Sequence, residues 1–480
     1  MATTPADLQG TKVLFIAYFY PPTESTGVPG SMRTVKFIRN LENGERHVLT
    51  TPERVTQEAD ALAHMSLPVN GEKVHRVAAW DIFRLLLSIR SGLRRLIGKG
   101  KQSGKTQGRD TPAKSTFKSS ADSAEISRSQ KLKDFVYDLS YFPDQAGPWI
   151  VPAFLKGRKL VRQHNLDVIF ATGSPWSGLI TGYLISKTTG KPLVVDFRDP
   201  WVNNPFHQSK GKLLDRWGAA LEKKVVNHAA AVSLNTEPLM EEFVQRYPEL
   251  ESDKFFVMPN GIDQRDFEHV RQQTHQERDK NTLSLCHAGF LYGVRDPAPL
   301  LDALRKINKA LEGKGQRITF TQIGDVSLDY DIRHTYSDLI EKGLLVLEPA
   351  KPYQACLQLL AAADIVINIQ SGTKTQIPSK LYDYLAINRP ILHLTPKTGA
   401  LGRLVERYQL GTCIEFESTE ELENYLSSKA TELARGELIT EEYPNRKRFL
   451  IEKISQTLAN ILARLAEKHK QLKNVHNFTR

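Results

Sequence analysis

Cysteine is scarce in this sequence of 480 residues, which contains only Cys286, Cys356 and Cys413. They lie far apart in apolar surroundings and form no Cys-x-x-Cys pair, which argues against a structural zinc site and against a disulfide framework. We interpret them as small buried hydrophobic residues. Long apolar runs are lacking too, because no stretch reaches the roughly 18 consecutive apolar residues of a membrane-spanning helix. Residues 1–12 have neither the basic region nor the apolar core of a signal peptide, which predicts a cytoplasmic protein.

Three short catalytic motifs are also missing. The sequence contains no His-Glu-x-x-His, no Gly-x-Ser-x-Gly and no Gly-x4-Gly-Lys-Ser/Thr. Metalloprotease, α/β-hydrolase and P-loop ATPase functions therefore lack support. The 40% of hydrophobic and 25% of charged residues are typical of a globular protein, and the length predicts two domains of roughly 200 residues each.

Acidic residues are nearly absent from one segment. The net charge of +11 is concentrated in residues 82–121, where Asp110 is the only acidic residue among ten Lys and Arg. A general affinity for nucleic acid explains such a local excess poorly. Residues 80–101 place arginines beside an apolar stripe, which predicts a helix at an anionic membrane surface. The Ser-, Lys- and Gly-rich stretch that follows predicts disorder. A solvated basic loop next to an ordinary packed helix is the alternative.

What is present is an alternation of apolar strands and helical patterns. The apolar run 13–19, a glycine-containing turn and a helical rhythm over 31–41 predict a strand, a turn and a helix at the start of a doubly wound sheet. The alternation stops near Trp80, resumes near Phe135, and starts again at 283 after a polar stretch. We therefore predict an α/β fold with two Rossmann-like parallel-sheet domains. Their expected bounds are 1–263 with the basic insert at about 81–134, a linker at 264–282, a second domain at 283–440, and a helix within 441–480 that crosses back.

Polar residues follow two strands of the first domain. The segment VVDFRDPW ends in Asp196, Arg198, Asp199 and Trp201. Because parallel strands expose their carboxyl ends at one sheet edge, these groups predict an acid/base or acceptor-binding site that faces a cleft. An ion pair that only shapes the loop is the alternative interpretation.

The preceding strand ends in TGSPWSG, which brings Thr172, Ser174 and Trp176 to the same edge. Aromatic rings beside hydroxyl groups suit a sugar or an amphiphilic acceptor. The turn PPTESTGVPG carries Gly27 and Gly30, whose lack of a side chain allows the backbone to approach an anion at the start of a helix. A turn that merely connects the strand to the helix is the alternative interpretation.

The second domain carries cations at equivalent places. In HAGFLYGVRDP, Gly289 and Arg295 follow the first strand, and an arginine there forms paired hydrogen bonds with phosphate. In IPSKLYDYLA, Pro378 fits the first turn of a helix, so Ser379 and Lys380 at the helix start address a diphosphate. Asp383, one turn further on, is placed to accept hydrogen bonds from ribose hydroxyls. An exposed arginine in a turn and an ordinary Ser-Lys helix start are the alternatives.

These motifs, in this order, resemble those of the glycosyltransferase family 4 group of GT-B enzymes. The resemblance covers about 12–80 and 140–415 and includes FYPPTESTGVPGSMR, VVDFRDPW, VMPNGID, HAGFLYGVRDPAPLLDAL, AAADIVINI and IPSKLYDYLAINRPIL. It implies a GT-B architecture, a nucleotide-sugar donor in the second domain, an acceptor in the first, and retaining transfer without an obligatory metal or other cofactor. It also implies that Arg295 and Lys380 neutralise the leaving diphosphate. The similarity is greatest to bacterial members that build cell-envelope polysaccharides with glycan or lipid-linked acceptors.

One departure from the family pattern leaves the activity open. The family's Glu-x7-Glu pair reads Thr375 and Asp383 here, so the first donor-binding glutamate is replaced and the second is one methylene shorter. The first hypothesis is a hexosyl- or N-acetylhexosaminyltransferase at the inner face of the cell membrane. A catalytically silent GT-B scaffold that binds a nucleotide-sugar or glycan, and a nucleotide-sugar epimerase on the same fold, are the alternatives.

Overall fold

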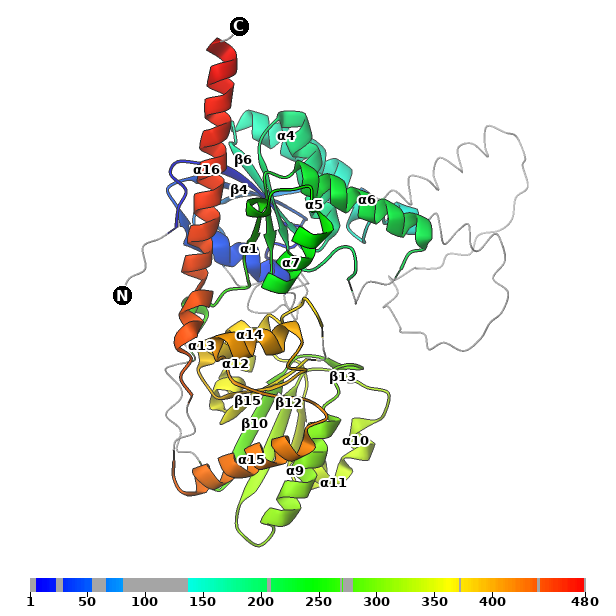
Figure 1. The fold of residues 1–480 in the computed structure, drawn as a ribbon, viewed down its shortest axis with the longest axis vertical. Helices are drawn as coiled ribbons and strands as arrows, with labels where there is room; N and C mark the ends of the chain where they lie inside the picture. The colour runs from blue at the N-terminus through cyan, green and yellow to red at the C-terminus, as the bar shows by residue number, and fades with distance from the viewer. Residues whose placement is uncertain are drawn as a thin grey trace, which may run out of the picture.

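The computed structural model describes residues 6–22, 29–53, 66–80, 137–204, 209–267, 270, 279–370, 373–437 and 441–478. They form two α/β domains, one above the other in Figure 1, each with a parallel sheet between layers of helices. The predicted membrane-surface helix and the predicted disordered segment, within 81–134, lie outside the described residues. No helix in the described ranges is both long and apolar enough to cross a lipid bilayer.

The first domain is built on a seven-stranded parallel sheet. Its spatial order is β5 (Lys73–Arg76), β4 (Glu45–Thr50), β2 (Lys12–Ile16), β6 (Val168–Gly173), β7 (Leu193–Phe197), β8 (Ala231–Leu234) and β9 (Phe255–Val257). The helices are α1 (Pro29–Asn40), α4 (Ile150–Gln163), α5 (Trp176–Thr189), α6 (Lys212–His228) and α7 (Glu237–Arg246). A pair of two-residue strands, β1 (Ala6–Asp7) and β3 (Leu41–Glu42), lies at its margin.

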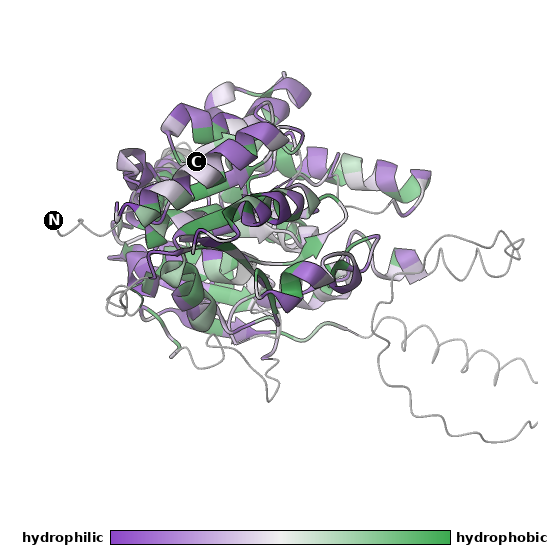
Figure 2. Cartoon of the chain, turned by 90° about the horizontal axis from the view of Figure 1, so that it is seen from below, coloured by the Kyte–Doolittle hydropathy of each residue, from purple (hydrophilic) through white to green (hydrophobic). Residues whose placement is uncertain are grey.

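Strand β2 shows why the first strands are continuous apolar runs. Leu14 and Ile16 pack on the face covered by α4 and α5, whereas Val13 and Phe15 pack on the opposite face under α1. A strand buried on both faces is therefore composed mostly of apolar residues. In Figure 2 the hydrophobic residues accordingly gather in the inner strands, and the outer helices carry hydrophilic stretches.

The second domain has a six-stranded parallel sheet. Its order is β14 (Leu345–Glu348), β12 (Arg317–Ile323), β10 (Thr282–Ala288), β15 (Ile365–Ile369), β16 (Ile391–Leu394) and β17 (Thr412–Ile414). Its helices are α9 (Ala298–Leu311), α10 (Ile332–Thr335), α11 (Ser337–Glu341), α12 (Tyr353–Ala362), α13 (Lys380–Ile387), α14 (Ala400–Tyr408) and α15 (Thr419–Ala434). Two short strands, β11 (Leu291–Tyr292) and β13 (Val326–Ser327), pair beside the sheet.

The last helix, α16 (Ile451–Phe478), leaves the second domain and packs along the first (Figure 1). Its apolar side chains join the same cluster as α1 and β2, and they are Ile451, Ile454, Leu458, Ala459 and Leu462. This spacing of three and four residues is that of one helix face. The sequence pattern predicted a helix from about 446 to 472, whereas residues Pro444–Phe449 form a 3-10 turn and the α-helix runs from 451 to 478.

Candidate active site

A cavity of about 350 Å³ lies between the two domains, at the carboxyl edges of both sheets. The first domain contributes residues that follow its strands, and the second contributes the β10–α9 loop and the segment before α13. The lining residues are Phe19, Ser174, Arg198, Asp199, Asn204, Asn235, Asn260, Tyr292, Arg295, Gln370, Gln376, Ile377, Pro378 and Ser379. Crevices at the carboxyl ends of parallel strands are where α/β proteins bind their ligands.

Three buried polar atoms of residues in this cavity's wall have no hydrogen-bond partner among the residues that the structure describes. They are Arg198 Nε, Gln370 Oε1 and Gln376 Oε1. A buried polar atom without a partner costs roughly 1–3 kcal/mol, so such atoms are uncommon in folded proteins. Their gathering around one cavity indicates a place where a polar ligand completes the hydrogen bonding.

Asp196 does not reach this cavity. Its side chain is fully buried, and its two oxygens accept hydrogen bonds from Arg33 at 2.9 and 3.0 Å. Thr172 and Ser233 donate to the same carboxylate, at 2.8 and 2.9 Å. These four bonds fix α1 to the sheet edge, and the predicted contact of Asp196 with an acceptor stays a prediction that the described contacts do not support.

The two tryptophans are also buried. Trp176 and Trp201 stack with ring centroids 5.8 Å apart in the core of the first domain, exposing 4% and 5% of their surfaces. Trp176 does not line the interdomain cavity, and its acceptor-binding role stays a prediction. Trp201 lines a second cavity of about 280 Å³ together with Phe142. That cavity shares Asn204 with the interdomain one, so the two adjoin.

Arg198 and Asp199 line the interdomain cavity, as does Ser174. Gln376 Nε2, from the second domain, donates a 3.0 Å hydrogen bond to Asp199 Oδ1. Burial raises the pKa of Asp199, and the neighbouring Arg198 charge and the Gln376 bond oppose that shift. The carboxylate is thus placed in the cleft and bonded across it, a position that suits a general acid or base.

Arg295 lines the second domain's wall of the cavity, and Lys380 lies behind that wall beside Gly289. The Arg295 guanidinium lies 5.2 Å from the centre of the Tyr292 ring, and Lys380 Nζ donates to His287 Nε2. Within the described ranges neither cation has a carboxylate partner. Burial, followed by the charge of Arg295, holds the pKa of Lys380 well below its ordinary value. Two adjacent cations without counter-ions favour binding of an anion such as a diphosphate.

His287 and Gln322 support this lysine, and sequence reasoning missed both. His287 Nδ1 lies 2.6 Å from Gln322 Oε1, and Gln322 Nε2 donates to the Gly289 carbonyl at 2.7 Å. Because an amide oxygen only accepts, the proton of His287 is on Nδ1 and its Nε2 accepts from Lys380. Burial lowers the pKa of His287 well below its usual value, so the ring is the neutral acceptor that this chain of bonds requires.

The structure places some of the predicted glycine and helix-start residues at the site and others outside the described residues. Gly289 has a φ of +131°, a conformation that favours glycine, and Lys380 Nζ lies beside it. Ser379 is the N-cap of α13 and lines the cavity, with Pro378 just before it rather than inside the first turn. Gly30 falls in the first turn of α1, and Gly27 lies outside the described residues.

Thr375 and Asp383 are not among the residues that line the cavity. The Thr375 carbonyl accepts a 2.6 Å bond from Thr236 of the first domain, and the following residue, Gln376, is the one that points into the cleft. Asp383 Oδ1 accepts from Tyr353 at 2.9 Å, and burial raises its pKa. The donor-binding roles of both residues stay predictions.

The comparisons with known proteins agree with this architecture. Residues 121–266 match the family Glycosyltransferase Family 4. A comparison with curated protein sequences finds no match. Among solved structures, the chain is similar to Anabaena HepE in complex with UDP, with 15% identity, 97% of this chain and 100% of that chain covered, and a TM-score of 0.51.

Two further structures show the same arrangement. The N-terminal domain of Candida albicans trehalose-6-phosphate phosphatase matches at 10% identity over 97% of this chain and 98% of its own, with a TM-score of 0.55. Sucrose-phosphate synthase from Thermosynechococcus elongatus matches at 11% identity over 98% and 100%, with a TM-score of 0.50. The fold is that of the GT-B glycosyltransferases, and the resemblance read from the motifs is confirmed by the fold and by the match over 121–266.

Proposed function

We propose that this chain is a retaining glycosyltransferase. It moves a hexosyl or N-acetylhexosaminyl group from a nucleotide-sugar to a glycan or lipid-linked acceptor in bacterial cell-envelope polysaccharide synthesis. The observation that carries the proposal is the interdomain cavity, with Arg295 on one wall, Lys380 behind that wall, and the Asp199 carboxylate on the other wall. Neither cation has a carboxylate partner in the part of the chain that the structure describes. This arrangement serves a reaction in which a diphosphate leaves on one side and a hydroxyl group attacks on the other.

The leaving diphosphate interacts with the second domain. Negative charge grows on it as the glycosidic bond breaks, and preorganised cations in a partly dry site stabilise that charge most strongly in the transition state. Arg295 lines the cavity, and Lys380 lies behind Gly289 at the start of α13. We propose that these two side chains supply the positive charge without an obligatory metal ion.

The acceptor side is the first domain. Asp199 is within the cleft and Ser174 lies on the same wall. The adjoining cavity, lined by Phe142 and Trp201, offers aromatic surface to the rest of an acceptor. We propose that Asp199 receives or orients the proton of the attacking hydroxyl group.

Calorimetric titration of UDP, GDP, ADP and dTDP into the purified chain without added metal tests the donor site. The HepE structures hold UDP and UDP-glucose, so UDP is the first nucleotide to try. We expect one nucleotide to bind clearly more tightly than the others, and turnover with its sugar derivatives. Failure of all four to bind would overturn the donor site, and tight binding without turnover would favour the scaffold hypothesis.

Asp383 tests the predicted ribose contact. Asp383→Asn removes the charge while keeping the shape, and we expect nucleotide binding to weaken by roughly 1.5–3 kcal/mol, the range for a hydrogen bond to a charged group. Tyr353→Phe is the matched control, because it removes the phenol that bonds Asp383 Oδ1 and leaves the carboxylate. Equal affinity of Asp383→Asn and the unaltered protein would refute the ribose role.

We also propose that the basic segment 81–121 attaches the protein to the anionic inner face of the cell membrane. Tyr137 and Leu139 follow this segment in the sequence, and Leu213 and Trp217 belong to α6; these four side chains are each 44–54% exposed. Lys210 Nζ ties the two stretches together by donating to the Tyr141 and Pro143 carbonyls. Removal of residues 81–134 should abolish co-sedimentation with phosphatidylserine vesicles and preserve activity on a soluble acceptor. Continued co-sedimentation would place the contact elsewhere.

A further inference from the structure

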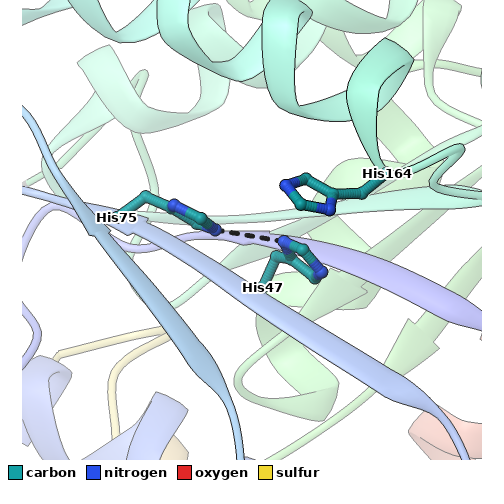
Figure 3. A group of neighbouring side chains, drawn as sticks. All are labelled: His47, His75 and His164. Atoms are coloured by element: carbon teal, nitrogen blue, oxygen red, sulfur yellow. Dashed lines mark hydrogen bonds between the residues drawn. The ribbon is translucent and has the colours of Figure 1, made fainter.

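Three histidines gather at the margin of the first domain, on the side of the sheet covered by α4. His47 belongs to β4 and His75 to the neighbouring β5, and His164 ends α4 with its backbone N–H bonded to the Leu160 carbonyl. One ring nitrogen from each lies within 4.8 Å of the other two. Figure 3 shows the three rings facing one another across the space between strands and helix.

The sheet register explains why two of the rings meet. His75 pairs with Leu49, which is two residues after His47, so both histidines project from the same face of the sheet. Leu49 packs with Ala153 and Leu160 of α4 in the core. The same packing that seats α4 on this face therefore brings its last turn over the two strands.

The separations are close to those of a metal site. Zinc-bound imidazole nitrogens lie about 2.0–2.1 Å from the ion, so two of them at a tetrahedral centre are about 3.3–3.4 Å apart. His47 Nδ1 and His75 Nε2 are 3.1 Å apart. The ring nitrogens of His164 make no hydrogen bond with any residue in the described ranges, so this side chain is free to turn toward the pair.

A carboxylate stands behind the cluster. Glu45 Oε2 is 3.4 Å from His47 Nε2, the nitrogen on the far side of the ring from His75. Histidine ligands of metals almost always donate their second ring N–H to a carboxylate, a carbonyl or water, which fixes the ring's orientation. Glu45 also pairs with Lys12 and Lys73. Burial lowers the pKa of His75, and the positive charges of Lys156 and Lys73 add to that shift. Glu45 offsets the charge of Lys73 through an ion pair.

We propose that His47, His75 and His164 bind one divalent transition-metal ion of the zinc type, with water in the fourth position. His47 is fully buried, and His75 and His164 are partly exposed, so the ion has protein on one side and solvent on the other. The site does not share residues with the interdomain cavity. A bound ion joins the edge strand β5 to β4 and to the end of α4, immediately before the basic segment begins.

The test uses the untagged full-length chain after treatment with a chelator. Zn²⁺ is titrated in competition with a chromophoric chelator, and Co²⁺ is added to a second sample to record its visible spectrum. We expect one ion per chain, a Co²⁺ spectrum typical of a tetrahedral nitrogen and oxygen site, and a melting temperature that rises with free Zn²⁺.

Variants identify the ligands. His164→Gln and His75→Gln should each lower the affinity at least 100-fold and remove the rise in melting temperature. Glu45→Gln should lower the affinity by about 10–100-fold, as loss of an outer carboxylate does. His334→Ala is the control, because His334 is exposed on α10 and remote from the cluster in sequence. If His164→Gln binds Zn²⁺ as tightly as the unaltered protein, or if the unaltered protein binds none, the proposal is overturned.

Discussion

The two walls of the interdomain cavity differ in how their charged side chains are paired. In the first domain each charged group has a partner of opposite sign close by. Arg198 and Asp199 line the cavity and lie near enough to shift each other's pKa values, and Arg33 holds Asp196 in the buried layer behind them. In the second domain the cations rest on an aromatic ring and a neutral imidazole instead, since Arg295 lies over Tyr292 and Lys380 bonds His287. The first wall therefore holds charges of both signs, whereas the positive charge of the second wall favours an anion.

The largest effect on stability should come from breaking the buried ion pair between Arg33 and Asp196. Arg33→Ala leaves the Asp196 carboxylate buried without its cation, which typically costs about 3–5 kcal/mol of unfolding free energy. Arg305→Ala is the matched control, because its pair with Asp338 is 40% and 47% exposed and should contribute no more than about 1 kcal/mol. Urea denaturation measures both, and equal midpoints for the two variants would contradict the comparison.

On the second domain's wall, Arg295→Ala should spare the fold and slow the reaction. Losing one group that stabilises developing negative charge lowers kcat by about 100- to 1,000-fold, or roughly 3 kcal/mol. Arg333→Ala, which changes an exposed arginine of α10, should leave kcat unchanged. Steady-state rates with the preferred donor decide the matter, and a normal kcat for Arg295→Ala would remove this residue from the mechanism.

Lys380 makes the binding of a diphosphate depend on pH. Burial lowers its pKa in the empty site, whereas a bound anion favours the charged amine and raises that pKa again. Between the two pKa values binding takes up a proton, so affinity should fall about tenfold for each unit that the pH rises.

Calorimetry in buffers of different ionisation enthalpy measures this proton uptake. Lys380→Met should bind more weakly and without any uptake of protons from this group. Uptake that persists in Lys380→Met would assign the proton to another group.

The smallest effect should come from the bond that joins the walls. Gln376→Ala removes the 3.0 Å hydrogen bond to Asp199, and a bond of this kind contributes about 0.5–1.5 kcal/mol. We expect a pH profile of kcat displaced on the limb that reports Asp199, with nucleotide affinity nearly unchanged. A weaker nucleotide affinity with an unaltered profile would mean that Gln376 serves the donor and not Asp199.

Local patterns predicted the elements that are buried on both sides. The run around Val13 and Phe15 is apolar because both of its faces are covered, and other central strands are mostly apolar with single buried polar residues such as Asp196 and His287. The sequence pattern did not predict strand β5, because Lys73, His75 and Arg76 are polar and lie at a sheet edge. The start of α16 was misplaced because the basic residues of 446–448 fit the helical pattern while the backbone there forms a 3-10 turn.

The sequence predicted several residues of the candidate site but not the long-range hydrogen bonds that hold them. Arg295 and Ser379 stand where a loop and a helix begin, which sequence spacing reveals. The pairing of Arg33 with Asp196 joins residues 163 positions apart, and the contact of His287 with Gln322 joins neighbouring strands. His287 sits in an apolar strand and resembles any buried residue there. Such long-range bonds depend on the assembled fold, which no single stretch encodes.

The chain passes between the domains twice, at adjacent places. Ile262 N–H donates to the Phe449 carbonyl at 2.7 Å, and Ile451 N–H donates to the Ile262 carbonyl at 2.9 Å. The two passages thus form a narrow double strip on one side of the cleft. Elsewhere the described domains meet through few polar contacts, including Gln376 with Asp199, Thr236 with Thr375, and Glu237 with Arg407. Rotation about this strip, with those contacts released, is the hinge movement by which we expect the cleft to open and let a product leave.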